Sequence, residues 1–465
     1  MKPLYDVVIV GGGNAAICAA FEARHAGASV LVIEAATPFM RAGNSRHTRN
    51  VRYMHIGDAG AMVGTYTEDE FYADLLQVTG GETDEDLARF TIRQSASLAE
   101  WMPAHGIKWQ SALKGTLQLA RTNAFFLGGG KALINTYYET AAKMGIEVIY
   151  ESPVVDVTMR DGMEHPHTLH MDTKDGPKTV DAKAIVVASG GFEANLEWLG
   201  LYWGEAANNF FIRGTPYNTG KMLRIFLDKG AKAVGNEREF HAVAVDARAP
   251  QFDGGIVTRL DTVPFSIAVN KYGKRFSDEG VDIWPKRYAV WGGLIARQDD
   301  QIAYSIMDSK AANTFMPSAF PAMKANSVHE LAKMLGLDPE AVVETVTEYN
   351  NHVVPGGTFD LTKLDDCRTE GLEIEKTHWA QTIDTPPFIG YPLRPGITFT
   401  YYGLGVNECA QVLDQQNKPL PNIYAAGEVM SGNILGRGYM AGFGMTIGSV
   451  WGRIAGREAA QNALR

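Results

Sequence analysis

The chain has 465 residues, of which 45% are hydrophobic and 21% are charged. This composition is typical of a globular protein with a sizeable core. The formal net charge of −10 excludes a dedicated nucleic-acid binder, which would be basic, and argues against attraction to an anionic membrane surface.

The first forty residues have the pattern of a strand, a glycine turn, a helix and a second strand. Asp6–Val10 and Ser29–Ile33 are short apolar runs, which are typical of buried parallel strands. A G-x-G-x-x-A motif between them precedes a helix-like stretch. Gly11 permits the tight turn, Gly13 lets the backbone approach a pyrophosphate, and Ala16 allows close packing of the helix on the strand.

An acidic residue ends the second strand, 18 positions after Ala16. This residue, Glu34, would accept a hydrogen bond from a ribose hydroxyl, and its charge disfavours a 2′-phosphate. The unit therefore predicts a dinucleotide site with contacts from Gly11, Gly13, Asn14, Ala15, Glu34 and Ala35.

Two later segments favour FAD over NAD. Ile185–Ala188 is an apolar run that is followed by glycines. The second segment starts at Asn422 and leads to Glu428, which precedes a glycine-rich stretch. A nucleotide-binding start whose sheet is completed only near the C-terminus is typical of FAD-binding oxidoreductases. We expect an α/β fold, in which a Rossmann-like FAD-binding domain (a parallel sheet with helices, residues 1–242 and 377–465) carries an inserted α+β capping domain (residues 243–376).

A second glycine cluster, at residues 128–132, reads GGGKA. It lacks the first glycine of a P-loop, and Ala132 stands where that motif has its metal-binding hydroxyl. We therefore expect a helix from Ala132 to Met144 instead of a P-loop.

The segment from Gly438 to Gly452 is the longest uncharged stretch near the C-terminus. Its 15 residues include five glycines, so it is too short and too flexible to span a bilayer. The three cysteines, Cys18, Cys367 and Cys409, are too scattered for a disulfide framework, an iron–sulfur cluster or haem attachment. We expect no metal site, no membrane span and a cytoplasmic location, where thiols stay reduced.

With these motifs the chain resembles the flavoproteins of the succinate dehydrogenase and fumarate reductase family. The shared strings are GGGNAA with Glu34, GNS at 43–45, ASGGFEAN at 188–195, VNKYGKRFSDEG at 269–280 and AAGE at 425–428. Within that family it is similar to the FAD-dependent tricarballylate dehydrogenases, through longer strings at 43–50, 120–135, 241–261 and 436–448.

The resemblance implies where FAD would lie. The adenine would face the backbone of Val154, which follows an expected strand at Glu147–Tyr150, and Glu428 would hold ribityl or ribose hydroxyls. A final helix from Thr446 to Leu464 would place its N-terminus at the N1/C2=O edge of the flavin and stabilise negative charge there. The other implied contacts are Gly43, Asn44, Ser45, Ala188, Gly190, Gly427, Gly442, Gly444 and Met445.

Some family members attach FAD covalently through a histidine. That position is Asn44 in this chain, and His47 lies three residues later. We therefore expect FAD to be held non-covalently.

The resemblance also implies the substrate residues. His241 and Thr258 match positions that bind substrate carboxylates, Arg287 matches the arginine that moves the proton, and Arg437 lies near a carboxylate-clamping arginine. Arg259 and Thr262 stand where fumarate enzymes have a glutamate–arginine relay, and Phe399 replaces a histidine. These changes make the expected pocket more positive, which suits a substrate with an additional carboxylate.

The reaction implied is the oxidation of tricarballylate to cis-aconitate, with a hydride passing to the flavin and a proton leaving the adjacent carbon. An arginine is an awkward base because its pKa exceeds about 12. It could pass the proton on only with the help of a nearby acid, Asp278 or Asp282. The alternative base is Tyr401, Tyr402 or Tyr439.

The family also implies a separate electron acceptor, an iron–sulfur protein at the membrane, which would hold the chain peripherally at the inner face. Three alternatives stay open at this stage. They are a fumarate- or succinate-type or ketosteroid-like flavin oxidoreductase, a flavin-binding protein without catalysis, and an enzyme of corrin-ring oxidation.

Overall fold

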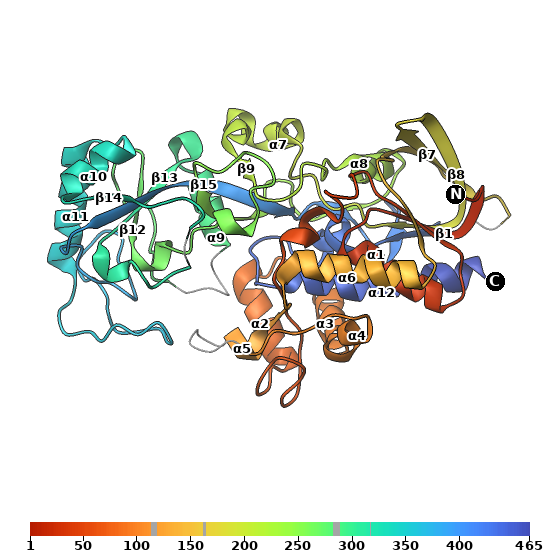
Figure 1. Ribbon diagram of the computed structural model, residues 1–465, viewed down its shortest axis with the longest axis horizontal. Helices are drawn as coiled ribbons and strands as arrows, with labels where there is room; N and C mark the ends of the chain where they lie inside the picture. The colour runs from red at the N-terminus through yellow and green to blue at the C-terminus, as the bar shows by residue number, and fades with distance from the viewer. Residues whose placement is uncertain (113–118, 161–163, 282–288, 317) are drawn as a thin grey trace.

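The computed structural model describes residues 1–112, 119–160, 164–281, 289–316 and 318–465. A larger part contains the N-terminus, the C-terminus and a mainly parallel sheet, and a smaller part contains a second sheet (Figure 1). The α/β fold predicted from the sequence is confirmed. The division at residues 242/243 and 376/377 stays a prediction.

The sheet of the larger part has eight strands, six of which run in the order β17-β18-β8-β1-β2-β5. The strands from β18 to β5 are mutually parallel, and β17 is antiparallel to β18. Their bounds are β1 Leu4–Val10, β2 Val30–Ile33, β5 Glu147–Ile149, β8 Gly176–Val187, β17 Gln411–Leu413 and β18 Pro419–Ala425. The apolar runs of the sequence analysis are therefore neighbours at the centre of this sheet.

An antiparallel hairpin extends the sheet, and the sequence analysis did not predict it. It consists of β6 (Val154–Thr158) and β7 (His167–Thr173), and β7 pairs with the first half of β8. Most side chains in that half of β8 are exposed or half-buried, whereas Ala184–Val187 is fully buried. Only the buried half has the continuous apolar pattern that marks a central strand.

Helices α1 (Asn14–His25) and α12 (Phe443–Ala463) pack against each other beneath this sheet (Figure 1). A Cβ atom on Gly452 would meet the backbone of Ala15, and one on Gly456 would meet the backbone of Ala19. Glycine on α12 therefore allows the two helix backbones to approach directly.

The remaining helices of the larger part lie around this core, and α2 to α5 form a separate group on one side (Figure 1). Among the described residues we find no helix with the length and apolar character that a membrane crossing requires. The bounds are α2 Glu68–Thr79, α3 Glu85–Ser95, α4 Leu98–Ala104, α5 Leu119–Thr122, α6 Gly129–Lys143, α7 Leu196–Trp203 and α8 Lys221–Asp228.

The second sheet has the order β11-β15-β13-β12, with β14 and β9 also paired to β15. Its long strand β15 reaches from the smaller part toward the larger one (Figure 1). The bounds are β9 Phe211–Ile212, β11 Phe240–Asp246, β12 Ile267–Asn270, β13 Ala303–Met307, β14 Met323–Ala325, β15 Phe388–Thr400, α9 Val290–Ala296, α10 Val328–Leu335 and α11 Pro339–His352.

The remaining elements are short. The two-residue strands are β3 Asn50–Val51, β4 Ala124–Phe125, β10 Ala233–Val234 and β16 Gly403–Leu404. The 3₁₀ turns are η1 Gly43–His47, η2 Gly204–Asn209, η3 Ile256–Thr258, η4 Val263–Phe265, η5 Asp299–Gln301, η6 Ser309–Ala311 and η7 Gly427–Asn433.

The close contact of α1 and α12 predicts that Gly456→Ala lowers the free energy of unfolding. The new methyl group would meet the backbone of Ala19, and overpacking of this kind costs about 1–3 kcal/mol. Gly200, in α7, has no heavy atom within 4 Å of an added Cβ, so Gly200→Ala should stabilise the chain by about 0.5–1 kcal/mol. Urea unfolding of both variants with FAD in excess measures these changes. A free energy of unfolding of Gly456→Ala equal to that of the wild type would contradict the prediction.

Candidate active site

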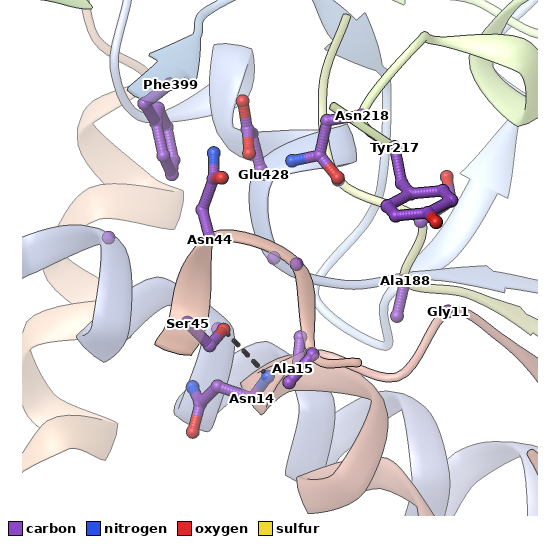
Figure 2. Close-up of a pocket in the computed structure, with 18 of the residues that line it drawn as sticks. Gly11, Asn14, Ala15, Asn44, Ser45, Ala188, Tyr217, Asn218, Phe399 and Glu428 are labelled. Carbon is purple, nitrogen blue, oxygen red and sulfur yellow. Dashed lines mark hydrogen bonds between the residues drawn. The ribbon is translucent and has the colours of Figure 1, made fainter. Parts of the chain in front are cut away.

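A long pocket extends from the N-terminus of α1 to the second sheet, and Figure 2 shows part of its wall. Its wall includes the loop after β2, the end of β8, the segment 217–222 and the end of β15. Elements that lie far apart in the sequence therefore converge on one space.

Two helix N-termini open into this pocket. Gly13 precedes α1 and Gly442 precedes α12, and neither helix has a side-chain cap among the described residues. Uncapped amides and the positive end of the helix dipole favour anions such as a pyrophosphate. Gly11 has φ +112° and its Cβ would strike the carbonyl of Ala188, so the turn before α1 needs glycine there.

The side chain of Asn14 joins these two helix starts. Its Nδ2 donates to the carbonyl of Met445 at 3.3 Å and to Ser449 Oγ at 3.0 Å. Its backbone N–H donates to Ser45 Oγ at 2.9 Å, as Figure 2 shows. One residue therefore fixes α1, α12 and the loop at 43–47 relative to one another.

Glu34 lies at one end of the pocket with Ala35 and Val154. Its carboxylate accepts the backbone N–H groups of Ala36 at 2.9 Å and Ala42 at 3.1 Å. Burial is the main effect on this carboxyl and raises its pKa. The two backbone donors leave further lone pairs for a ribose hydroxyl, because each carboxylate oxygen accepts more than one hydrogen bond.

At the other end, the side chain of Asn44 ties the turn η1 to the second sheet. Its Nδ2 donates to the carbonyl of Thr398 at 2.8 Å and to Glu193 Oε1 at 2.5 Å. Its Oδ1 accepts the N–H of Thr215 at 2.7 Å. An amide in this position holds the loop and offers no imidazole for a covalent attachment.

Glu193, which is fully buried, and Glu428, which is half-buried, form a pair of carboxyl groups next to this loop. Glu193 Oε1 accepts Asn218 Nδ2 at 2.7 Å, and Glu428 Oε1 accepts the N–H of Thr400 at 2.8 Å. Asn44, Asn218 and Glu428 converge in Figure 2. Burial raises the pKa of both carboxyls, and the proximity of Glu193 raises that of Glu428 further. These shifts favour retention of a proton by the pair.

A positively charged region lies at the end of the pocket that the turn η1 lines. Arg213 and Arg259 are both buried, and His241 lines the pocket with them. Arg213 Nη2 donates to Thr398 Oγ1 at 3.1 Å, and Arg259 Nη2 lies 2.5 Å from Asp261 Oδ2.

His241, on β11, stays neutral in this region. Burial lowers its pKa well below the usual value, and the charges of Arg213 and Arg259 act in the same direction. Its Nδ1 lies 3.3 Å from Thr398 Oγ1, and its ring meets that of Tyr439 edge to face at 3.9 Å. This part of the pocket can therefore hold anionic groups with two arginines and one neutral imidazole.

The structure brings most predicted residues to this pocket. Of the predicted substrate residues, His241 and Arg259 are among its lining residues. The predicted cofactor residues that line it are Gly11, Gly13, Asn14, Ala15, Glu34, Ala35, Gly43, Asn44, Ser45, Val154, Ala188, Gly190, Gly427, Glu428, Gly442, Gly444 and Met445. Thr446 is buried behind them, and its hydroxyl donates to the carbonyl of Arg52.

Other predicted substrate residues are not among the described lining residues. Thr258 Oγ1 donates to the carbonyl of Gly255 at 2.9 Å, and the hydroxyl of Tyr401 donates to the carbonyl of Gly438. Arg437 is 54% exposed, and its Nη1 lies 3.8 Å from Glu82 Oε1. Arg287 and Asp282 lie outside the described residues, so their roles stay predictions.

Sequence reasoning missed Arg213, Glu193 and Asn218. Arg213 follows the two-residue strand β9, and no motif surrounds it. Glu193 lies in the string ASGGFEAN, which the sequence analysis used for its glycines and for the family resemblance but not for this carboxylate. Its burial signals its role, and burial becomes visible only in the folded chain.

A family model described as FAD binding domain matches residues 6–444. The NADH:fumarate oxidoreductase of Klebsiella pneumoniae (strain 342) is 27% identical over 475 residues, which cover 99% of this chain and 48% of that protein. The chain therefore spans about half the length of this relative.

Two solved structures share the fold. A flavocytochrome c3 fumarate reductase in its open conformation has a TM-score of 0.78 and 24% identity, over 100% of this chain and 79% of that one. The 3-ketosteroid delta1-dehydrogenase from Sterolibacterium denitrificans, in complex with 1,4-androstadiene-3,17-dione, has a TM-score of 0.78 and 18% identity, over 99% and 100%. None of these three proteins is named for tricarballylate.

The carboxyl pair predicts a pH-dependent effect of Glu193→Gln on stability. The folded pKa of both carboxyls lies above the ordinary value of 4.5, so their contribution to stability is greatest below that pH and declines as pH rises. Glutamine keeps an acceptor for Asn44 and Asn218 but carries no charge. The stability of the wild type relative to Glu193→Gln should therefore fall between pH 4.5 and pH 8, measured by urea unfolding. If the difference in the free energy of unfolding between the wild type and Glu193→Gln does not change with pH, the carboxyl pair does not retain a proton.

Proposed function

Because the chain belongs to the FAD binding domain family and its cofactor is FAD, we propose that it is a dehydrogenase that oxidises tricarballylate to cis-aconitate. The observation that carries the proposal is the burial of Arg213 and Arg259 beside His241, in the pocket that also holds the predicted flavin contacts. Two buried cations in one wall favour a substrate with several carboxylates.

The residues of the pocket fit FAD. Glu34 and Val154 would hold the adenosine end, the N-terminus of α1 the pyrophosphate, and Gly43–Ser45 with the N-terminus of α12 the flavin. When bound, FAD supplies a two-electron acceptor for a hydride from the substrate.

Arg213, Arg259 and His241 would bind and orient the substrate carboxylates. A charge-assisted hydrogen bond to such a group is worth about 1.5–3 kcal/mol. Clamping also makes the neighbouring C–H bond easier to deprotonate, because the cations stabilise the negative charge that develops on the carboxylate side. The resemblance adds Arg287 as the residue that moves the proton, and this assignment stays a prediction.

A second candidate is the reverse type of reaction, reduction of an unsaturated dicarboxylate. It is favoured by the 27% identity to a protein named NADH:fumarate oxidoreductase. A ketosteroid is disfavoured, because a neutral steroid offers no carboxylate to the arginines that line the pocket. A flavin-binding protein without catalysis is a further alternative, which a failure of any acid to reduce the flavin would support.

The test is an anaerobic titration of the purified holoprotein, followed by the visible absorbance of oxidised flavin. We expect tricarballylate to bleach this absorbance, and succinate and a ketosteroid to leave it unchanged. If only succinate bleaches the flavin, the protein is a dehydrogenase, but tricarballylate is not its substrate. Absence of bleaching with all three compounds would contradict the proposed function.

Replacement of the arginines checks the carboxylate clamp. Arg213→Met and Arg259→Met should each raise the Kd of tricarballylate about 10- to 150-fold, which corresponds to the loss of one charge-assisted hydrogen bond. Arg368 is half-exposed and pairs with Glu370, so Arg368→Met is the matched control. An unchanged Kd in both pocket variants would show that the substrate binds elsewhere.

We further propose that electrons leave the flavin for a separate electron-transfer protein, an iron–sulfur protein in the terms of the family resemblance. Steady-state turnover with tricarballylate should then be slow with oxygen and at least tenfold faster with an artificial electron acceptor. An oxygen electrode and a dye-reduction assay on the same preparation make the comparison. Rapid turnover with oxygen would indicate an oxidase.

A further inference from the structure

His47 and Asp253 form a hydrogen-bonded pair in the pocket that holds the two buried arginines. His47 ends the turn η1, and its Nε2 lies 2.6 Å from Asp253 Oδ1. Its ring is among the lining residues, with 10% of the side chain exposed, whereas 25% of the Asp253 side chain is exposed. The sequence analysis considered His47 only as a possible flavin attachment.

The second nitrogen of the His47 ring is kept uncovered by a glycine. Nδ1 makes no hydrogen bond with any residue in the described ranges. A Cβ atom on Gly255 would lie 2.9 Å from this nitrogen, so any larger residue there would cover it. Gly255 also has φ +70°, a conformation that side chains rarely adopt.

The charge state of His47 follows from its neighbours. Burial has the largest effect and lowers its pKa, and the charges of Arg213 and Arg46 act in the same direction. The contact with Asp253 opposes this shift without reversing it. The ring is therefore neutral at pH 7, and Asp253 favours the tautomer with the proton on Nε2 and a lone pair on Nδ1.

We propose that His47 is the catalytic base of the dehydrogenation and that Asp253 is its positioning residue. The inference rests on the proposed function. As the hydride leaves one substrate carbon for the flavin with its electron pair, the adjacent carbon gives a proton to His47 Nδ1. The electron pair of that second C–H bond forms the new C=C bond. The imidazolium is stabilised by Asp253 and afterwards releases the proton to water.

This arrangement avoids the difficulty of an arginine base. A guanidinium, with a pKa above about 12, must lose a proton before it can accept one. A neutral imidazole next to a carboxylate accepts a proton without that step and gains an ion pair in doing so. Arg213 lines the same pocket, and its charge acts on the His47 ring, so the proposed base and one proposed carboxylate contact are neighbours.

The experiment measures flavin reduction after anaerobic rapid mixing of the holoprotein with tricarballylate. His47→Gln and His47→Ala should slow reduction at least 100-fold, with flavin content unchanged and the Kd of tricarballylate within threefold of the wild type. Added imidazole should restore part of the rate in His47→Ala. His329, which pairs with Glu340 at the surface, provides the matched control His329→Gln, with a wild-type rate.

Asp253→Asn tests the pairing through the pH profile. The base must be neutral, so the wild-type reduction rate should fall only when the pH drops below the ordinary range of histidine. Loss of the carboxylate lowers the pKa of His47 further, so the acid limb of Asp253→Asn should move to lower pH. A role for Asp253 in folding alone would leave the position of this limb unchanged.

The outcomes separate the inference from the proposed function. If neither tricarballylate nor succinate reduces the wild-type flavin, both are overturned, because His47 then has no proton to accept. If one acid reduces the wild type and reduces His47→Gln equally fast, the inference alone is overturned. Slow reduction in Arg287→Ala together with a normal rate in His47→Gln would assign the base to Arg287.

Discussion

The direct contact between α1 and α12 is the constraint on which the site depends. Glycines at 452 and 456 allow the two backbones to touch, and this contact places the N-termini of both helices at one pocket. Asn14 then fixes their relative position through Met445 and Ser449. Two uncapped helix starts in one space create a positive potential that needs no charged side chain. The pyrophosphate and the anionic edge of a reduced flavin are the groups that such a potential favours.

Local patterns predicted the dinucleotide part of this site, because its determinants are close in sequence. Gly11 and Glu34 belong to one strand–helix–strand unit, and their spacing alone indicates what they hold. The hairpin β6–β7 was missed because its strands are half exposed. Arg213 and Glu193 were missed for another reason. Their roles depend on burial and on partners from β15 and η1, and only the folded chain brings these partners together.

The pocket keeps its titratable groups in states that suit different tasks. Arginines stay charged when buried because their pKa is so high, whereas the buried imidazoles of His47 and His241 lose their charge. The carboxyl pair of Glu193 and Glu428 favours retention of a proton. Charged arginines and neutral imidazoles therefore line the same pocket. A site with one fixed charge pattern could bind an anion but could not accept its proton.

Strand β15 connects Arg213 to the turn η1. The carbonyl of Thr398 accepts a hydrogen bond from the side-chain amide of Asn44. The hydroxyl of Thr398 accepts a hydrogen bond from Arg213. Two residues later, the N–H of Thr400 donates to Glu428. The same short segment therefore holds Arg213, a proposed substrate contact, and two predicted flavin contacts. A displacement of this segment would strain all three hydrogen bonds at once, so the three contacts tie the end of the second sheet to the cofactor end of the pocket.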